Sequence, residues 1–286
     1  MSQPLLVEAI ESSFIPVLVY NNKKEDEQLL KDFNEPSWNN PVVRYLNHDA
    51  KDLIPRKDRV WATDAIAQQM IAALKANKSK VPEYLQLFES KSAKTEKAIF
   101  AMHCYWEGEG NLGQIPGVKN TRSAWLRSQE VVEVDFDPAV VDYKTLLQKA
   151  QEMKCASTVY ATNPKQFETA KSLVKDKAKQ IGDKETSRVA KLSDQKYYLR
   201  NSYYKFLPLS LAQSTKINAA LMPGREDREK NANRFLSPRQ RELLAKIKLA
   251  YKKSPESFKE IVFPEDDSKL IDYHDKLTQT LENVLK

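Results

Sequence analysis

The chain has 286 residues, of which 41% are hydrophobic and 30% charged, and its formal net charge is +7. This length suits two domains, or one domain with large extensions. No apolar run approaches the length that crosses a bilayer, so we expect no membrane-spanning segment. Lys and Arg alternate with Glu and Asp along predicted helices, which favours solvated helix faces over a nucleic-acid-binding surface.

The cysteine and histidine content argues against a metal centre. Two cysteines exclude a disulfide-dense scaffold and a cysteine-based zinc site, and three widely separated histidines offer no ligand spacing. We therefore expect no metal and no other cofactor. Residues 1–14 lack a basic region followed by an apolar one, so we expect no secretory signal and take the cytoplasm as the default compartment. Export after removal of such a segment stays open.

The first 80 residues predict a small α/β domain that opens with a strand and a helix. Residues 14–20, FIPVLVY, form a short β-branched run typical of a buried strand. Residues 23–33, KKEDEQLLKDF, have the polar start and the apolar spacing of a helix. A βα unit is therefore expected near the start of the chain.

A hairpin and a closing helix are expected to complete this domain. Residues 38–56 suggest a hairpin that turns near Asp49 and Ala50. Residues 63–76 predict a helix for which Thr63 is a suitable N-cap.

This order of elements, with Pro41 just before a strand, resembles a trimmed thioredoxin fold. No CxxC motif is present, and residues 20–23, where the redox dithiol would be expected, contain no sulfur. The resemblance therefore implies a domain that cannot perform thioredoxin chemistry by itself, and a scaffold or docking role is favoured.

Residues 95–182 predict a second domain with the order β-α-β-β-α-β and a final helix. The predicted strands cover residues 97–102, 118–125, 130–136 and 156–162, and the predicted helices cover 107–115, 142–153 and 164–181. Right-handed crossovers turn this order into a ferredoxin-like sheet in which the first strand lies between the third and the fourth. Four of the six glycines lie between residues 108 and 117, so we expect the first helix to be short or distorted.

Residues 183–286 predict a helical C-terminal extension. Helix starts are expected at the Ser-Pro pairs 237–238 and 254–255. Residues 196–221 contain four tyrosines and predict a long apolar helix. Interleaved aromatic and basic residues can bind single-stranded nucleic acid, but the apolar spacing favours packing over another domain. We expect this segment to cover one rim of the central sheet.

Three reactive side chains are expected to meet at that rim. Cys104 follows the end of the first strand of the second domain, Glu130 begins the third, and Cys155 immediately precedes the fourth. The third and fourth strands run antiparallel to the first, so their beginnings lie beside its end. Cys104 stands at a strand-to-helix turn, where free N–H groups and the helix dipole stabilise a thiolate. Glu130 shares a strand face with apolar residues, so its half-buried carboxyl could act as a general acid.

Simpler interpretations of the same residues stay open. Free cysteine is commonly buried as a small apolar side chain, and this explanation suits Cys155 as well as a redox role does. It is less suitable for Cys104, because Tyr105 and Trp106 would form an aromatic wall that a core cysteine does not require. Glu130 could be an exposed carboxylate at the start of a strand.

Three motifs of the second domain carry a recognisable pattern. They are AIFAMHCYWEGEGNLGQIPGVKNT from residue 98, EVVEVDFDPAVVDYKTLL from residue 130 and STVYATNPKQFETA from residue 157. In this order they resemble the A-type peptide methionine sulfoxide reductases, whose motifs are A-T-F-A-G-G-C-F-W-G-V-E-A-A-F-x-x-L-P-G-V-x-x-T, H-A-E-V-V-E-V-x-F-D-P-x-x-x-S-Y-x-x-L-L and S-A-I-F-Y-x-x-x-x-Q-x-x-x-A. The resemblance covers about residues 97–173 and implies the fold of that catalytic core.

The resemblance also implies roles for individual residues. Cys104 would attack the sulfoxide sulfur, Glu130 would protonate the sulfoxide oxygen, and Tyr105 and Trp106 would line a pocket for the methyl group. The sulfenic acid left on the nucleophile would be reduced by a second thiol, with Cys155 as the candidate resolving thiol and an external thiol reductant as a partner. The implied substrate is a small molecule or a protein that carries oxidised sulfur.

The sequence departs from the family pattern around this site. The loop between Thr121 and Glu130 is reduced to RSAWLRSQ, which removes a pocket wall and a tyrosine. The family segment that carries an aspartate and a tyrosine before the fourth strand is absent, and Met102 and His103 replace two glycines. These departures put binding of a methionine sulfoxide in question.

A second resemblance concerns residues 115–121, IPGVKNT. Together with the thioredoxin-like front, they resemble a group of thioredoxin-like proteins and selenoproteins with the motif V-P-G-U-x-x-T, with Val118 at the selenocysteine position. Two functions stay open. The chain is a thiol-dependent oxidoreductase that acts through Cys104 on methionine sulfoxide or a related sulfur compound, or it is a binding or structural protein that keeps the fold without turnover.

Overall fold

The structure is a computed structural model that describes residues 4–36, 38, 42–88, 94–182, 185–261 and 270–286. The chain divides into two compact units, Met1–Ser92 and Ala93–Lys286. A finer division at residues 80, 95 and 182 stays a prediction, because compactness alone groups the second and third predicted segments. None of the helices in the described ranges is long and apolar enough to span a bilayer.

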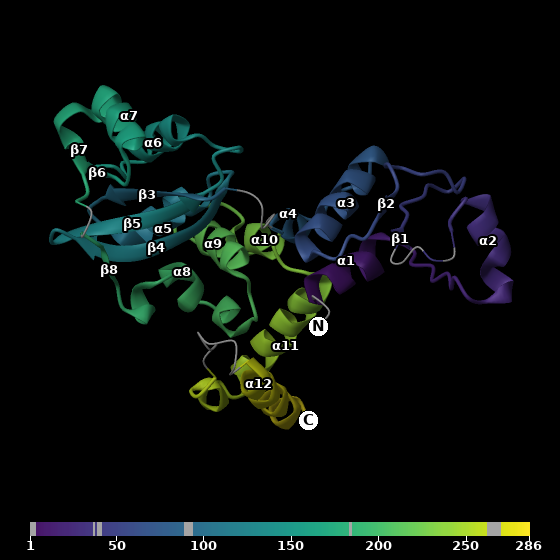
Figure 1. Ribbon diagram of the computed structural model, residues 1–286. Helices are drawn as coiled ribbons and strands as arrows, with labels where there is room; N and C mark the ends of the chain where they lie inside the picture. Colours follow the sequence, from purple (N-terminus) through teal and green to yellow (C-terminus); the bar gives the residue numbers. More distant parts are fainter. Residues whose placement is uncertain (1–3, 37, 39–41, 89–93, 183–184, 262–269) are drawn as a thin grey trace. The chain divides into compact units, whose positions relative to one another are not determined.

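The first unit is mainly helical, with a very small sheet (Figure 1). Its helices are α1 (Pro4–Ser13), η1 (Lys24–Asp26), α2 (Glu27–Asp32), α3 (Thr63–Ala76) and α4 (Glu83–Gln86). The strands β1 (Val42–Val43) and β2 (Lys57–Asp58) pair antiparallel. Its core is formed chiefly by apolar side chains of α1, α3 and α4, including Leu6, Met70, Leu74, Tyr84 and Leu85.

The predicted strand at residues 14–20 is wrong. These residues form no strand, and Ile15 and Val17 are 93% and 76% exposed. Their β-branched composition favours an extended chain, but no partner strand pairs with them within the described residues, so no ladder forms. A trimmed thioredoxin fold is therefore not shown for this unit, and Pro41 lies outside the described residues.

The other predicted elements of this unit are largely confirmed. The helix predicted from residue 23 is present as η1 and α2. The hairpin turns where expected, because Ala50 N–H donates to Asn47 O at 3.1 Å and Leu46 pairs with Asp52. Helix α3 begins at Thr63, but Ala62 occupies the N-cap position and contributes no side-chain hydrogen bond.

The second unit is built on a six-stranded sheet with the order β7-β6-β3-β5-β4-β8. All neighbouring strands are antiparallel except β6 and β7. As predicted, the first strand of the domain lies between the third and the fourth. The strands are β3 (Glu96–Ala101), β4 (Val118–Leu126), β5 (Gln129–Phe136), β6 (Thr158–Ala161), β7 (Ala178–Gln180) and β8 (Arg188–Val189).

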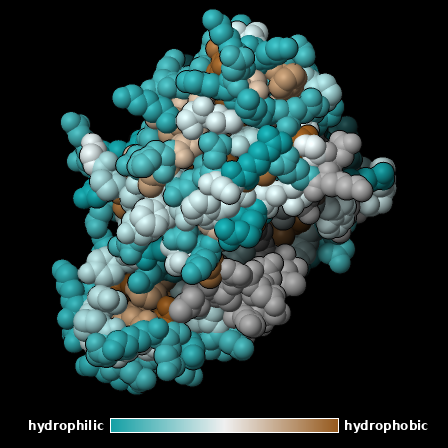
Figure 2. Space-filling model, turned by 90° about the vertical axis from the view of Figure 1, so that its left-hand side faces the viewer, coloured by the Kyte–Doolittle hydropathy of each residue, from teal (hydrophilic) through white to brown (hydrophobic). Residues whose placement is uncertain are grey.

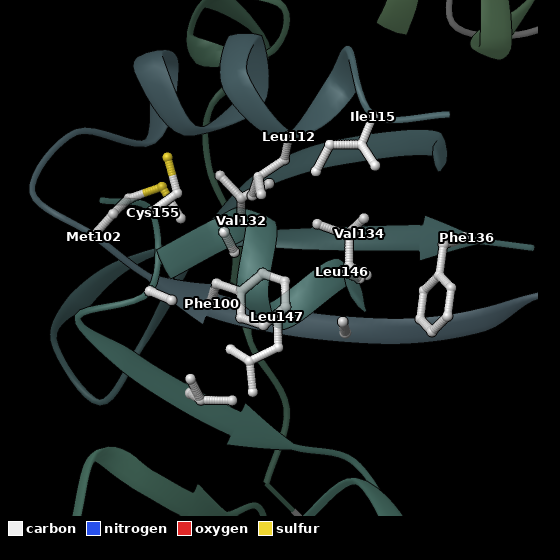
Figure 3. Packing of buried hydrophobic residues seen from close by; sticks show 14 of the residues in the cluster. Phe100, Met102, Leu112, Ile115, Val132, Val134, Phe136, Leu146, Leu147 and Cys155 are labelled. Atoms are coloured by element: carbon white, nitrogen blue, oxygen red, sulfur yellow. The ribbon is translucent and has the colours of Figure 1, made fainter. Parts of the chain in front are cut away.

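Helices α5 (Tyr105–Gly113), α6 (Tyr143–Glu152) and α7 (Pro164–Val174) accompany this sheet. Alternate residues of β3 and β5 face an apolar cluster shared with α5 and α6, which includes Phe100, Val132, Leu112 and Leu146 (Figure 3). Since strand side chains alternate between faces, Glu130 lies on the same face as Val132.

The helix predicted over residues 164–181 is too long. Pro164 begins it as expected, but it ends at Val174, where Lys175 has a φ of 50°. The chain continues through η2 (Lys175–Lys177) into β7, which pairs parallel with β6. The spacing of apolar residues in 175–181 is compatible with a helix, but residues 178–180 pair with β6 at the edge of the sheet instead.

Helix α5 is a regular helix of nine residues despite its glycines. A Cβ at Gly108 would overlap Met102 Sδ and lie 2.9 Å from a Val132 methyl group, and one at Gly113 would lie 3.1 Å from Thr215 Cγ2. The glycines thus permit close approach of the sheet on one side and of the C-terminal part on the other. The predicted distortion is not observed.

The C-terminal part of this unit contains many short elements. They are η3 (Leu192–Asp194), α8 (Tyr197–Arg200), η4 (Tyr203–Phe206), α9 (Leu211–Ala220), α10 (Arg228–Asn233), α11 (Pro238–Lys253), η5 (Pro255–Phe258) and α12 (Leu270–Leu285). The long apolar helix predicted in residues 196–221 is wrong, because Pro208 lies between η4 and α9 and proline cannot donate the hydrogen bond that a continuous helix needs.

The two Ser-Pro pairs differ in outcome. Ser237 accepts a hydrogen bond from Gln240 N at 3.2 Å in a full capping box, so α11 begins as predicted. The pair 254–255 begins only the single turn η5. The face in Figure 2 is mostly hydrophilic with small separate apolar patches, which suits the expected solvated helix faces.

Candidate active site

Cys104 lies at the junction of β3 and α5, as the sequence predicts. It is the N-cap residue of α5 with extended backbone angles, and its carbonyl accepts the N–H of Gly108 at 3.1 Å. Its side chain is free and half-buried. Cys104 therefore stands at the positive end of the helix dipole, and its side chain makes no capping hydrogen bond to the helix.

Glu130 lies beside this junction. Its backbone carbonyl accepts the N–H of Met102 at 3.1 Å, which brings the start of β5 to the end of β3. Its Oε2 accepts the N–H of Tyr105 at 2.7 Å, so the carboxylate binds the first turn of α5. The side chain is half-buried and points toward the helix that carries Cys104. The predicted meeting of thiol and carboxyl group at one rim is confirmed.

Four aromatic rings surround the helix start. Tyr105 makes edge contacts with Trp106 and Trp125, at centroid distances of 6.1 and 5.8 Å. Tyr197 stacks on Trp106 at 4.0 Å with an interplanar angle of 12°. The expectation that residues 196–221 cover this rim is thereby confirmed for Tyr197. Trp106 Nε1 is buried and, among the described residues, has no hydrogen-bond partner.

The hairpin between β4 and β5 explains how Trp125 reaches the site. Arg127 and Ser128 both have positive φ, 48° and 63°, as in a two-residue type I′ turn. The register of this tight hairpin places Trp125 directly opposite Glu130. A tight turn thus stands where the sequence resemblance implied a longer loop, and Trp125 packs against Tyr105 beside the helix start.

Two tyrosine hydroxyls near the site are held in the protonated form. Burial, followed by the Asp194 carboxylate, raises the pKa of Tyr105 to about 12. Burial raises the pKa of Tyr198 to about 12 as well, and the charges of Cys104 and Glu107 contribute. Both hydroxyls are therefore neutral at neutral pH, and that of Tyr105 is already hydrogen-bonded to the Asp194 carboxylate.

A buried ion pair holds the covering segment in place. Glu109 is fully buried, and its carboxylate accepts the Lys196 N–H at 2.7 Å and the Lys196 Nζ at 2.9 Å. Thr121 donates to the same carboxylate at 3.2 Å. Because Lys196 immediately precedes α8, this pair fixes the helix that presents Tyr197 and Tyr198.

Cys155 lies at the same end of the sheet but in a different environment. It is 3% exposed and belongs to the apolar cluster of Figure 3, where it appears at the same end as Met102. Burial raises the pKa of its thiol to about 11, and the Glu107 charge adds to this, while a hydrogen bond from Asn111 Nδ2 at 3.7 Å acts against it. The thiol donates to Met153 O at 3.3 Å.

The structure thus brings the five predicted site residues to one end of one sheet, with Cys155 below the surface. Sequence reasoning missed Trp125, Asp194 and Asn111, and it named Tyr197 and Tyr198 only as members of a covering segment. Trp125 could have been found from the sequence, because a two-residue hairpin turn within RSAWLRSQ places Trp125 opposite Glu130. The sequence carries no comparable signal for Asp194 or Asn111.

Comparison with known proteins gives partial matches. No family model matches the chain. A peptide methionine sulfoxide reductase MsrA 1 of Mesorhizobium japonicum is 28% identical over an alignment of 110 residues, covering 29% of this chain and 64% of that protein. A peptide methionine sulfoxide reductase MsrA of Yersinia enterocolitica is 39% identical over 70 residues, covering 18% of this chain and 33% of that protein.

Among solved structures, methionine sulfoxide reductase A of Corynebacterium diphtheriae covers 40% of this chain and 79% of its own, with 19% identity and a TM-score of 0.34. The chain spans less than two thirds of the length of each of the two reductases that it matches in sequence. The two sequence matches support a core similar to these reductases, and they leave the rest of the chain unmatched.

Proposed function

We propose that the chain is a thiol-dependent oxidoreductase that reduces methionine sulfoxide or a related sulfoxide through Cys104. The observation that carries this proposal is that the Glu130 carboxyl group accepts the N–H of Tyr105, the residue after the half-buried Cys104, at 2.7 Å. The similarity to reductases of this class over the same core supports it.

The chemistry follows from these two groups. The Cys104 thiolate attacks the sulfoxide sulfur while Glu130 donates a proton to the sulfoxide oxygen. The oxygen passes to the thiol, which becomes a sulfenic acid, and the substrate leaves as a sulfide. A thiol reductant then attacks the sulfenic acid, water leaves, and a second thiol resolves the mixed disulfide to restore Cys104. The substrate loses one oxygen atom and the reductant loses two electrons.

The aromatic side chains provide the binding surface in this proposal. Tyr105, Trp106 and Trp125 offer an apolar wall for a methyl or methylene group next to the sulfur. The unpartnered Nε1 of Trp106 would gain a partner in a polar atom of the substrate, since a buried donor without an acceptor is unfavourable. Tyr197 covers Trp106, so substrate binding would require this ring to move or would use only the part of the wall left open.

Cys155 is a poor nucleophile in its described setting. Its raised pKa keeps it as a thiol at neutral pH, so it would act as a resolving thiol only after its surroundings open. An external thiol is therefore the preferred reductant in the proposal.

The covered aromatic wall favours a second candidate function. If Tyr197 never leaves Trp106, the chain would keep the fold as a binding or structural protein without turnover. This alternative predicts an unreactive Cys104 and no sulfoxide reduction.

The decisive experiment measures reduction of free and peptide-bound methionine sulfoxide with dithiothreitol as reductant. The parent protein should turn over, and Cys104→Ser should reduce the rate to the uncatalysed background. Cys155→Ser is the matched control and should keep most of the activity, because dithiothreitol can attack the sulfenic acid directly. Equal rates for the parent and Cys104→Ser would reject the reductase proposal.

A further inference from the structure

Two half-buried methionine sulfur atoms beside α5 are not used by the site described above. Met222 Sδ accepts a hydrogen bond from Arg225 Nη2 at 3.7 Å, and Met153 Sδ accepts one from Gln114 Nε2 at 3.6 Å. Because a thioether sulfur is only a weak acceptor, both N–H groups lack a strong partner at these positions. Oxidation of either sulfur to a sulfoxide would add a polar oxygen next to a waiting donor.

The donor beside Met222 is a half-buried guanidinium without a countercharge. Besides the sulfur, Arg225 donates only to neutral oxygens: Gln114 Oε1, Gly110 O at 3.3 Å and Asn111 Oδ1 at 3.4 Å. Within the part of the chain that the structure describes, no carboxylate pairs with it, and its Nε is buried without a partner. Burial accordingly lowers the pKa of this guanidinium. An oxygen with partial negative charge would stabilise the cation in this setting.

The sulfur of Met222 is held in place but is not sealed from solvent. A Cβ at Gly110 would lie 2.9 Å from Met222 Sδ and 3.2 Å from Tyr198 Cε2, so this sulfur packs directly on α5. The 3.7 Å between the sulfur and the guanidinium exceeds the length of a charged N–H···O bond, about 2.7–2.9 Å, so an oxygen on the sulfur has room to reach Nη2. Met70 and Met102, in contrast, are only 1% and 7% exposed.

We propose that Met222 is a site of oxidation by hydrogen peroxide and that Arg225 binds the resulting sulfoxide. The sulfur lone pair attacks one peroxide oxygen, the O–O bond breaks, and the proton on the transferred oxygen passes to the leaving hydroxide to give water. The sulfur loses two electrons and the peroxide gains them. The sulfoxide oxygen then accepts a charge-assisted hydrogen bond from the guanidinium. Oxidation therefore adds a contact here, whereas methionine oxidation in a core is disruptive.

The test uses the full chain with Cys104→Ser, so that neither a sulfenic acid nor turnover at Cys104 affects the result. After peroxide treatment, peptide mass spectrometry should find Met222 oxidised well before Met70. In urea titrations, peroxide should lower the folding equilibrium constant no more than it does when Met222→Leu is added, because the new oxygen finds its donor. A larger loss than in Met222→Leu, or a Met222 that peroxide does not oxidise, would overturn the proposal.

Two further variants assign the effect to the guanidinium. With Arg225→Gln, peroxide should lower the folding equilibrium constant about ten-fold more than in the chain that keeps Arg225, because the charged hydrogen bond to the sulfoxide is lost. Arg228→Gln removes the same charge from an exposed position at the start of α10 and should leave the response to peroxide unchanged. Equal responses of these two variants would show that Arg225 does not bind the sulfoxide and would overturn the proposal.

Discussion

Cys104 caps the first turn of α5 and is half-buried among aromatic rings, whereas Cys155 is 3% exposed inside an apolar cluster. Both sulfur atoms lie at the same end of one sheet. The first stands at the N-terminus of α5, next to the Tyr105 N–H that Glu130 binds, whereas the polar contacts of the second are the Asn111 amide and the Met153 carbonyl. Position at a shared rim therefore does not make two cysteines equivalent, because burial raises the pKa of the Cys155 thiol and removes it from solvent.

The largest expected effect is on the rate of sulfoxide reduction and comes from Glu130, the carboxyl group next to Cys104. Glu130→Gln should lower the rate of sulfoxide reduction by about 10²- to 10⁴-fold, because the amide cannot donate the required proton as an acid does. The amide oxygen can still accept the Tyr105 N–H, so the fold should persist. Asp135→Asn, on the opposite face of the same strand, is the control. Similar rates for the parent and Glu130→Gln in steady-state kinetics would contradict the role of Glu130.

The second prediction tests the two thiols directly. A thiol pKa of about 11 instead of 9.0 lowers the thiolate fraction about a hundred-fold at neutral pH. Iodoacetamide at pH 8 should therefore label Cys104 at least about a hundred-fold faster than Cys155, as followed by peptide mass spectrometry. Equal rates would mean that the cluster around Cys155 opens freely.

The raised pKa of Cys155 also predicts a pH dependence of stability. The pKa is higher in the folded chain than in the unfolded chain, so the folded state holds its proton more firmly. This contribution to stability is complete below about pH 9 and is lost as the pH rises toward about 11. Urea titrations at several pH values, with Cys155→Ala as the reference, should show a larger loss in the parent, because the buried tyrosines with raised pKa contribute equally to both proteins.

A further effect on stability is expected from the ion pair that anchors the cover over Cys104. Lys196→Met leaves Glu109 buried without its cation and should lower the free energy of unfolding by about 3–5 kcal/mol. The double variant Glu109→Gln/Lys196→Met should recover part of this loss. Chemical denaturation measures both, and strict additivity of the single variants would show that the two side chains do not interact.

The smallest effect is expected from the cover itself. Tyr197→Ala removes a stacked ring from Trp106 and should raise the labelling rate of Cys104 by about two- to ten-fold, while the rate of Cys155 stays constant. Tyr203→Ala removes a tyrosine that contacts Tyr251 instead and serves as control. An unchanged Cys104 rate in Tyr197→Ala would show that the ring does not limit access.

Prediction from sequence succeeded where a pattern extended over a whole element and had a partner to pair with. The spacing of apolar residues and the order of the elements correctly predicted β3, β5 and the helix α6 between β5 and β6. They also predicted that Cys104, Glu130 and Cys155 lie at one rim of the sheet. Residues 14–20 have the composition of a strand, but they pair with no strand within the described residues and most of them are exposed.

The residues that surround the site could not be predicted from the sequence. The stacking of Tyr197 on Trp106 joins residues 91 positions apart in sequence through a buried ion pair that no local pattern reveals. The depth of Cys155 depends on how the cluster closes over it, and a single cysteine before a strand carries no information on that.

The glycines of α5 limit how far the second unit can be shortened. A helix with glycine at three of nine positions has little tendency to form alone, and alanine cannot replace Gly108 without displacing Met102. The helix therefore depends on support from both sides, with Thr215 of α9 pressed against Gly113. A fragment of residues 95–182 would lose that support, so we expect the helix that Cys104 caps to fold correctly only when the C-terminal helices are expressed with it.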